Sequence, residues 1–422
     1  MCEYGGSESP RIAQNSFRVY DYIAEMPVRS KLDGLSAALC TVDLPSEPTE
    51  PITELLGDCR YIGSYDWSPD AAQGNPSIVI PGSPNMWSEP TLPCQIPPDE
   101  GRQIKDNNIY ILRDQPLLPL LAAVDEQQIF PREDWKTIDF ITDRNGLRKL
   151  LRWIGGAGGK GFRLDTQLVG EKTVVFNRWE VVETELMRGN MYTLNFEKAV
   201  TKPMSPSIER SAWHHRIVTY KFGQFRLMVQ FEVDACLPEE QWQPAASSSE
   251  HELINAMASV GLSSQNQSSS TSATSVSSPT GTTQGRSEAF GIKIKQQGRA
   301  DIPHSAIIEL ATKSSAGIGW TDRYPQLYFS QTGNHHMGNR RAGNFIRIDK
   351  FTRSSPELLA VHQRLQPTFK KLEEALRRLQ SIAIEHGKDE RLSLVYDKPN
   401  LTVHRNLTSQ SCFPAEALAL FN

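Results

Sequence analysis

The most regular hydrophobic pattern in the chain is a strict alternation in FRLMVQFEVDA, residues 225–235. The apolar residues Phe225, Leu227, Val229, Phe231 and Val233 share one face, and the polar residues Arg226, Gln230, Glu232 and Asp234 share the other. Because side chains alternate across a strand, the pattern predicts a β-strand with two carboxylates on one side. Such a pair is also common on an ordinary half-exposed strand, so the pattern alone assigns no chemistry.

A second strand is predicted by the apolar run of IIELATK, residues 307–313. The period of two places Glu309, Ala311 and Lys313 on one face. A carboxylate that ends an apolar run is costly to bury without a partner, and a metal ion is one way to satisfy it. Clustered Asp and Glu oxygens without thiols favour Mg²⁺ or Mn²⁺ over zinc.

Two stretches have helical spacing. In TDRNGLRKLLRWI (142–154), four apolar side chains recur at helical intervals, which predicts an amphipathic helix. Residues 355–386 predict one broken helix or two successive helices, with Ser355 as N-cap before Pro356 and a core-packed apolar face. LSLVYDKPNLTVHRN (392–406) then predicts a closing hairpin.

Other segments lack such periodicity. Residues 42–104 are rich in proline, which favours extended segments and turns, with IVIP (78–81) as the one expected strand. Residues 263–287 are a serine- and threonine-rich run that is too polar to bury and is expected to be a disordered loop. We therefore expect an N-terminal arm over residues 1–130 that packs on a core domain over residues 131–422, with the insertion at about 244–288.

The amino-acid composition excludes few classes of protein function. The 422 residues carry a formal charge of −4, which leaves room for a local basic surface that binds nucleic acid. The six cysteines contain no CxxC pair, so neither a zinc site nor a disulfide framework is suggested, and a reducing compartment is favoured. The N-terminus lacks an apolar leader and PLLPLLAAV (116–124) is too short to span a bilayer, so we expect an intracellular, soluble protein.

Several familiar sites are disfavoured. GGAGGKG (155–161) resembles a phosphate loop, but Ile154 and Gly161 stand where a Walker A motif requires glycine and Ser or Thr. His335 and His336 are neighbours rather than one helical turn apart, so a surface loop is expected there instead of a zinc pair. The chain has no adjacent aspartate pair, which a prenyl-diphosphate synthase would need.

Five short motifs occur in an order that resembles the DXO family of RNA 5′-end decapping nucleases. They are Arg144 within TDRNGLRKLL, GNMYTLNFE (189–197), FEVD (231–234), IELATK (308–313) and YFSQT (328–332). The resemblance covers roughly residues 140–345. It implies an α/β fold of mixed β-sheets flanked by helices, with a core like that of the PD-(D/E)XK nucleases.

The resemblance also implies roles for individual residues. Arg144 and Gln331 would contact the substrate. Two divalent cations, Mg²⁺ or Mn²⁺, would be held by Glu197, Glu232, Asp234 and Glu309. Catalysis would use Glu232, Asp234, Glu309 and a lysine, for which Lys313 is the candidate. The implied partners are an RNA 5′ end and a 5′→3′ exoribonuclease, and the implied location is nuclear or cytoplasmic.

The lysine departs from the family pattern. The family places it two residues after the glutamate, where this chain has Ala311, and Lys313 lies one strand repeat further on the same face. Successive same-side positions are roughly 6.6–7 Å apart, so Lys313 would have to lean back to act. Two hypotheses therefore stay open: a metal-dependent hydrolase of RNA 5′ ends, or a catalytically impaired RNA-binding or exoribonuclease-partner protein of the same fold.

Overall fold

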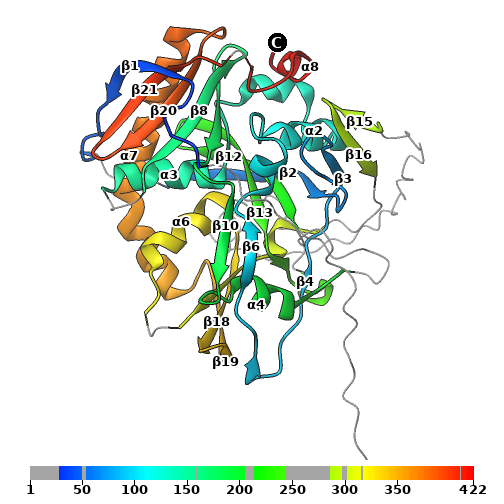
Figure 1. The fold of residues 1–422 in the computed structure, drawn as a ribbon. Coiled ribbons are helices and arrows are strands. Elements are labelled where there is room, and N and C mark those ends of the chain that lie inside the picture. Colours follow the sequence, from blue (N-terminus) through cyan, green and yellow to red (C-terminus); the bar gives the residue numbers. More distant parts are fainter. Residues whose placement is uncertain are drawn as a thin grey trace, which may run out of the picture.

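The computed structural model describes residues 28–49, 54–156, 160–204, 213–242, 286–296, 302–314, 317–408 and 410–422. These residues form two large β-sheets and a separate two-stranded one, with helices packed against them (Figure 1). Both large sheets contain parallel and antiparallel strand pairs. The predicted class, mixed sheets flanked by helices, is confirmed.

In the described part of the chain, twelve strands make the large sheet. In spatial order they are β1 (Leu35–Val42), β21 (Asn400–Asn406), β20 (Arg391–Asp397), β8 (Phe162–Val169), β9 (Thr173–Trp179), β7 (Phe140–Asp143), β13 (Phe225–Val233), β12 (His214–Phe222), β2 (Leu56–Trp67), β3 (Ser77–Ile80), β16 (Ile292–Gln296) and β15 (Glu288–Ala289).

The second sheet has seven strands within the described residues: β11 (Thr201–Lys202), β4 (Met86–Trp87), β14 (Ala235–Cys236), β17 (Ile307–Lys313), β18 (Asn334–Arg341), β19 (Asn344–Thr352) and β5 (Cys94–Gln95). A separate pair joins β10 (Thr184–Arg188) to β6 (Glu100–Ile104). The chain passes from the large sheet to the second sheet between β13 and β14, which are separated by a single residue.

Helices cover both faces of the large sheet. The helices are α1 (Asn107–Ile111), α2 (Leu118–Gln127), α3 (Arg144–Ile154), α4 (Thr193–Ala199), α6 (Trp320–Ser330), α7 (Pro356–His386) and α8 (Ala415–Leu418). Helices α3, α6 and α7 pack on one another and on β7, β8, β9 and β13, whereas α2 packs on β2 and β3 and α4 on β17 (Figure 1). This arrangement leaves α3, α6 and α4 around the junction of the two sheets.

The alternation in residues 225–233 is confirmed by β13. Its apolar face lies in the core beneath α3, α6 and α7, as predicted. The strand is central rather than half-exposed, because β7 and β12 flank it and both Met228 and Gln230 on its other face are buried. Glu232 is the strand's one exposed residue.

The predicted helices and hairpin are also present. Asp143 caps α3 by accepting a hydrogen bond from the Gly146 backbone N–H at 2.6 Å, a standard way to satisfy a helix N-terminus. Residues 356–386 form one helix with Pro367 inside it, so the open choice between one and two helices is resolved. Strands β20 and β21 form the hairpin.

The proline-rich N-terminal part supplies strands to the large sheet. IVIP contributes β3 as expected, but the expectation that it is the one strand of residues 42–104 is wrong, because β2, β4, β5 and β6 also lie there. Strands β1 and β2 pair with β21 and β12. The serine-rich segment falls largely on residues 243–285, which lie outside the described residues. In the part of the chain that the structure describes, no helix is long and apolar enough to cross a membrane.

Buried neutral histidines make the fold sensitive to acid. Burial lowers the pKa of His304 to about 3, from an ordinary 6.5. The unfolded chain therefore binds a proton at His304 more tightly than the folded chain does. The contribution of neutral His304 to folding stability is complete above pH 6.5 and is lost as the pH falls toward 3. His304 Nε2 contacts the carbonyls of Ser330 and Gln331, contacts that a glutamine amide can imitate.

We expect His304→Gln to flatten the acid limb of stability. Urea unfolding between pH 4 and 6 should show a slope smaller than that of wild type by about 1.4 kcal/mol per pH unit, one proton's worth. The comparison is made between variants because the raised carboxyl pKa values described below act in the opposite direction. Parallel curves for the two proteins would show that His304 is not the group responsible.

Candidate active site

Glu232 and Asp234 lie at the crossing between the two sheets. Glu232 is the penultimate residue of β13, and Asp234 is the single residue between β13 and β14. The Asp234 carboxylate accepts a hydrogen bond from the Leu310 backbone N–H at 2.7 Å. Because β14 pairs with β17, this contact fixes the carboxylate against the strand that carries Glu309.

The Glu309 carboxylate is engaged on both oxygens. Arg144 Nη1 donates to Oε2 at 2.7 Å, and the Gln326 side-chain amide donates to Oε1. The Arg144 and Glu309 side chains are both buried, with 8% and 9% of their surface exposed. A buried pair of this kind is held by mutual attraction, and removing either partner leaves an uncompensated charge.

Arg144 reaches the site because of the strand order. Strand β7 runs parallel to β13, so the end of β7 and the start of α3 lie beside the end of β13 that carries Glu232. Asp143 is held in turn by Arg178 Nε at 2.5 Å. Arg144 is therefore presented from a fixed helix N-terminus.

These side chains line one cavity of about 340 Å³. Its walls come from α3, α4, β13, β17, β18 and α6. The lining residues are Arg144, Thr193, Leu194, Glu197, Glu232, Asp234, Glu309, Leu310, Ala311, Thr312, Arg323, Gln326, Leu327 and His335. The structure thus brings together all four predicted carboxylates and Arg144.

Crowding raises the carboxyl pKa values in this cavity. The Glu232 side chain is open to the cavity, but protein surrounds it closely, and this desolvation raises its pKa to about 7, with a further contribution from Asp106. Burial, followed by repulsion from Glu309 and Glu197, raises the pKa of Asp234 well above its ordinary value. Burial is thus the first cause of both shifts, and neighbouring carboxylates add to it.

Lys313 lies apart from this cavity. It is the last residue of β17, and its ammonium group pairs with Asp349 of β19 at 3.4 Å. It is not among the cavity-lining residues, whereas Ala311 is, with 5% of its surface exposed. No lysine lines the cavity in the described part of the chain, and a role for Lys313 stays a prediction.

Gln331 also points elsewhere. It ends α6 in a left-handed conformation (φ 53°), donates to the Tyr328 carbonyl at 2.6 Å and accepts a hydrogen bond from Arg353. Gln326 and Arg323, on the preceding turns of α6, face the cavity instead. Residues three positions apart lie on one face of a helix, so the sequence could have shown that Arg323 and Gln326 face the same way. The resemblance in motif order points to Gln331 instead.

The expectation that His335 lies in a surface loop is wrong. The expected surface loop is strand β18, where His335 and His336 are both buried. His335 Nδ1 lies 2.9 Å from the Glu309 carbonyl, and the residue lines the cavity. Sequence spacing disfavoured a metal-binding pair but could not show that a parallel strand pairs Glu309 with His335.

A family model described as "Domain of unknown function (DUF8563)" matches residues 36–417 of the chain. The chain belongs to the DUF8563 family. No curated protein matches it. The family assignment covers both sheets and every residue of the cavity, so the site lies within the DUF8563 domain.

Solved structures of Rai1 share the fold of this DUF8563 chain at low identity. Candida albicans Rai1, in complex with pU5–Mn²⁺, has a TM-score of 0.55 at 12% identity, covering 90% of this chain and 98% of that one. Scheffersomyces stipitis Rai1, in complex with (3′-NADP)⁺ and calcium ion, has a TM-score of 0.53 at 11% identity, covering 88% and 92%. The likeness shows that the chain shares the Rai1 fold, and it shows the fold alone.

The donor set of the DUF8563 cavity suits a divalent cation. Carboxylate oxygens are the ligands that Mg²⁺ and Mn²⁺ prefer, and four carboxylates line this one cavity. Among the described residues, however, no three His, Cys, Asp or Glu side chains already converge as a metal-binding group. Glu197, Glu232, Asp234 and Glu309 are the side chains that would hold an ion.

Proposed function

We propose that this protein hydrolyses phosphate bonds at RNA 5′ ends with the help of divalent cations. The observation that carries the proposal is the single cavity that contains Glu197, Glu232, Asp234 and Glu309 beside Arg144. The Rai1 structures of the same fold, one of them described with pU5–Mn²⁺, support RNA and a divalent metal as the ligands. The proposed class includes decapping, pyrophosphohydrolase and 5′→3′ exonuclease activity.

The chain's own residues divide the work in this proposal. Bound cations would lower the pKa of water and neutralise charge on the phosphate. Glu197, Glu232, Asp234 and Glu309 would hold the cations, and the Gln326 amide donates to the Glu309 carboxylate. Arg144, which pairs with Glu309, would bind a phosphate oxygen of the substrate, because a guanidinium matches phosphate geometry.

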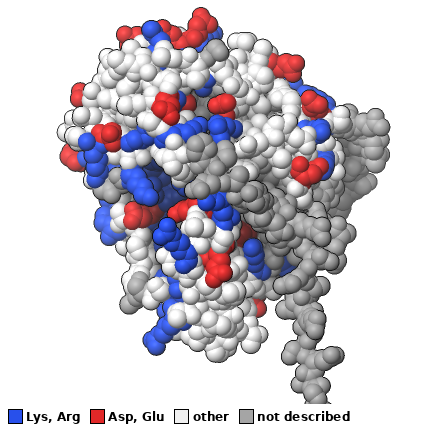
Figure 2. Space-filling model, in the orientation of Figure 1, with Lys and Arg blue, Asp and Glu red and all other residues white. Residues whose placement is uncertain are grey.

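A basic pocket on the neighbouring face of α3 supports a polyanionic substrate. It has a volume of about 520 Å³, and its basic lining residues are Lys105, Lys149, Arg152, Lys160 and Arg178. Arg152 and Lys160 have no ion pair with a carboxylate in the described part of the chain. Figure 2 shows basic side chains gathered in the region where Figure 1 places α3, as an RNA backbone would require.

A second candidate function is RNA binding without turnover, including service as a partner of an exoribonuclease. The observation that favours it is Ala311 in the cavity, with Lys313 paired to Asp349. Hydrolysis would then lack the positively charged group that the related nucleases place beside the glutamate. Cation-dependent RNA binding is common to both candidates, so turnover separates them.

Ala311→Lys is the variant that tests this difference. Because Ala311 faces the cavity two residues after Glu309, a lysine there can reach the phosphate, and we expect single-turnover cleavage to rise by roughly tenfold or more. The assay uses 5′-labelled RNAs that carry a triphosphate, an unmethylated cap or a monophosphate, with Mn²⁺ or Mg²⁺. Lys313→Gln tests the other lysine candidate: because its ammonium group pairs with Asp349 outside the cavity, we expect cleavage within about twofold of wild type, and a loss of cleavage would assign the catalytic charge to Lys313.

The outcomes are distinct. Cleavage by wild type establishes the hydrolase, and cleavage only by Ala311→Lys establishes the binding protein. If neither protein cleaves and neither binds RNA in the presence of Mn²⁺, both candidate functions are wrong.

A further inference from the structure

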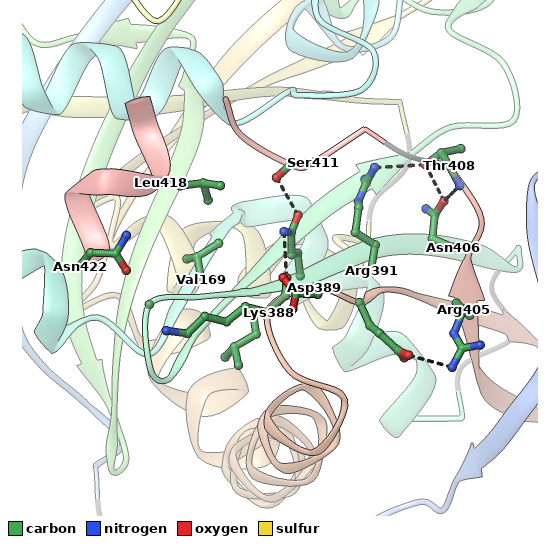
Figure 3. A pocket seen from close by; sticks show the side chains of 14 residues that line it. Val169, Lys388, Asp389, Arg391, Arg405, Asn406, Thr408, Ser411, Leu418 and Asn422 are labelled. Carbon is green, nitrogen blue, oxygen red and sulfur yellow. Dashed lines mark hydrogen bonds and ion pairs between the residues drawn. The ribbon is translucent and has the colours of Figure 1, made fainter. Parts of the chain in front are cut away.

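A second polar cavity lies on the side of the large sheet where its parallel strands start, away from the carboxylate cavity at their ends. Its volume is about 450 Å³, and its walls include the β8–β9 turn and the segments around β20 and β21 (Figure 3). Residues Gln167–Gly170 line it, and Val169 pairs with Thr173 at the start of β9. Because β9, β7 and β13 run parallel, this cavity lies toward the starts of these strands, whereas Glu232 and Asp234 follow their ends.

Arg391 is the unusual residue of this cavity. It is 9% exposed, and its Nη1 donates to Thr408 Oγ1 at 3.1 Å. Its Nε is buried without a hydrogen-bond partner, and within the described residues it has no carboxylate at ion-pair distance. The arrangement can be followed in Figure 3.

Three other buried arginines of this chain pair with carboxylates. Arg144 pairs with Glu309, Arg163 with Asp165, and Arg178 with Asp143 among others. Burying a guanidinium without a counter-charge is costly, because it loses hydration that nothing replaces. Arg391 therefore lacks the counter-charge that these other sites contain.

The rest of the cavity also favours an anion. Lys388, which pairs with Glu171 at 2.7 Å, and Arg405 stand at its edge, and Asn406, Thr408 and Ser411 supply polar groups. Of the two acidic lining residues, Glu390 is held by Arg405 at 2.8 Å and by His386 at 2.9 Å, and Asp389 is exposed to solvent. The Gln167 side chain fixes the wall by accepting from Ser411 Oγ and the Cys412 N–H at 3.1 and 2.9 Å.

We propose that this cavity is a binding site for an oxyanion group of a small molecule, with Arg391 as the residue that pairs with it. A guanidinium recognises phosphate and carboxylate by the same pair of parallel hydrogen bonds, so the shared chemistry is the oxyanion. The volume is in the range of ligand-binding pockets and leaves space for a group of about nucleotide size. The site is separate from the carboxylate cavity, and it does not depend on the proposed RNA chemistry.

Calorimetric titration of the full chain tests the site. The probes are inorganic phosphate, adenosine 5′-monophosphate, adenosine and succinate, each at constant ionic strength with chloride as the balancing anion. The proteins are wild type, Arg391→Gln, Arg391→Lys and Arg405→Gln. We expect wild type to bind phosphate or succinate and not adenosine, and Arg391→Gln to bind at least roughly tenfold more weakly.

The other variants separate the anchor from the rim and from general charge. Arg405→Gln changes an exposed residue and should weaken binding by no more than about threefold. Arg391→Lys keeps the charge but loses the planar donors, so it should bind with intermediate affinity even if Arg391→Gln fails to fold. Stronger binding of phosphate and the nucleotide than of succinate identifies a phosphorylated ligand, and the reverse identifies a carboxylate.

Two results would overturn the proposal. One is the absence of heat or saturation with every anion in wild type. The other is equal binding by wild type and both Arg391 variants, which would place the anion elsewhere, for example at Arg144.

Discussion

Asp234→Asn is expected to abolish stabilisation by Mn²⁺ and to reduce RNA cleavage by roughly a hundredfold or more, the scale on which a catalytic group contributes. Asparagine has nearly the same shape, and its carbonyl oxygen can still accept the Leu310 N–H, so the crossing between the sheets is preserved. What is lost is one negative oxygen at the point where burial and neighbouring carboxylates crowd Asp234 most.

The same substitution should stabilise the metal-free protein. A carboxyl whose folded pKa is raised contributes stability at low pH and loses it as the pH rises through that pKa, so an ionised Asp234 opposes folding at neutral pH. Asparagine removes this repulsion. Thermal unfolding in EDTA should therefore show a higher midpoint for Asp234→Asn than for wild type. With Mn²⁺, only the wild-type midpoint should rise, because a ligand that binds the native state stabilises it.

The matched control is Glu357→Gln, which neutralises an exposed carboxylate in the first turn of α7. It should leave both the Mn²⁺ shift and cleavage unchanged. Wild-type behaviour of Asp234→Asn with Mn²⁺ would contradict the assignment of this carboxylate as a cation ligand. A lower midpoint in EDTA would instead indicate a structural role for the charge.

The elements that the sequence predicted well are those whose signal is local. The alternation of residues 225–233 and the helical spacing of residues 144–154 and 356–386 reflect which side chains face the core, and each became the expected strand or helix. The order of strands is not a local property. Nothing in the proline-rich region shows that β2 would lie between β12 and β3, because such pairing depends on residues far apart in the chain.

The candidate site was predicted in part for the same reason. Four carboxylates and Arg144 share a cavity because β7 runs parallel to β13 and β14 pairs with β17, an outcome that motif order anticipated but periodicity could not. Gln331 illustrates the limit. A glutamine at the end of a helix can turn with the C-cap, and here the left-handed turn directs it to Arg353 while Gln326 faces Glu309.

Arg144→Gln is expected to lower the free energy of unfolding in EDTA by about 3–5 kcal/mol, the usual cost of breaking a buried ion pair. The reason is that Glu309 would remain buried beside Glu232 and Asp234 without its guanidinium partner. Mn²⁺ should restore part of this loss, since a bound cation supplies the positive charge that the variant lacks. Urea unfolding with EDTA and with Mn²⁺ measures both effects.

Arg148→Gln is the matched control, because it makes the same change one turn further along α3. Burial and the nearby Arg144 lower the pKa of Arg148 to about 10, so its charge is unfavourable there and it has no carboxylate partner among the described residues. Its removal should cost less than about 1 kcal/mol and should not respond to Mn²⁺. Equal losses in the two variants would mean that α3 packing, not the pair with Glu309, explains the Arg144 effect.

The double variant Arg144→Gln/Glu309→Gln then shows whether the charges act as a pair. If they do, neutralising Glu309 relieves the repulsion that Arg144→Gln exposes, and the double variant is more stable in EDTA than Arg144→Gln alone. It should also gain less from Mn²⁺, because one of the proposed ligands is gone. If the double variant loses as much unfolding free energy as the two single variants together, Arg144 and Glu309 do not act as a pair. The idea that a bound cation can take the place of the Arg144 charge beside Glu309 would then be wrong.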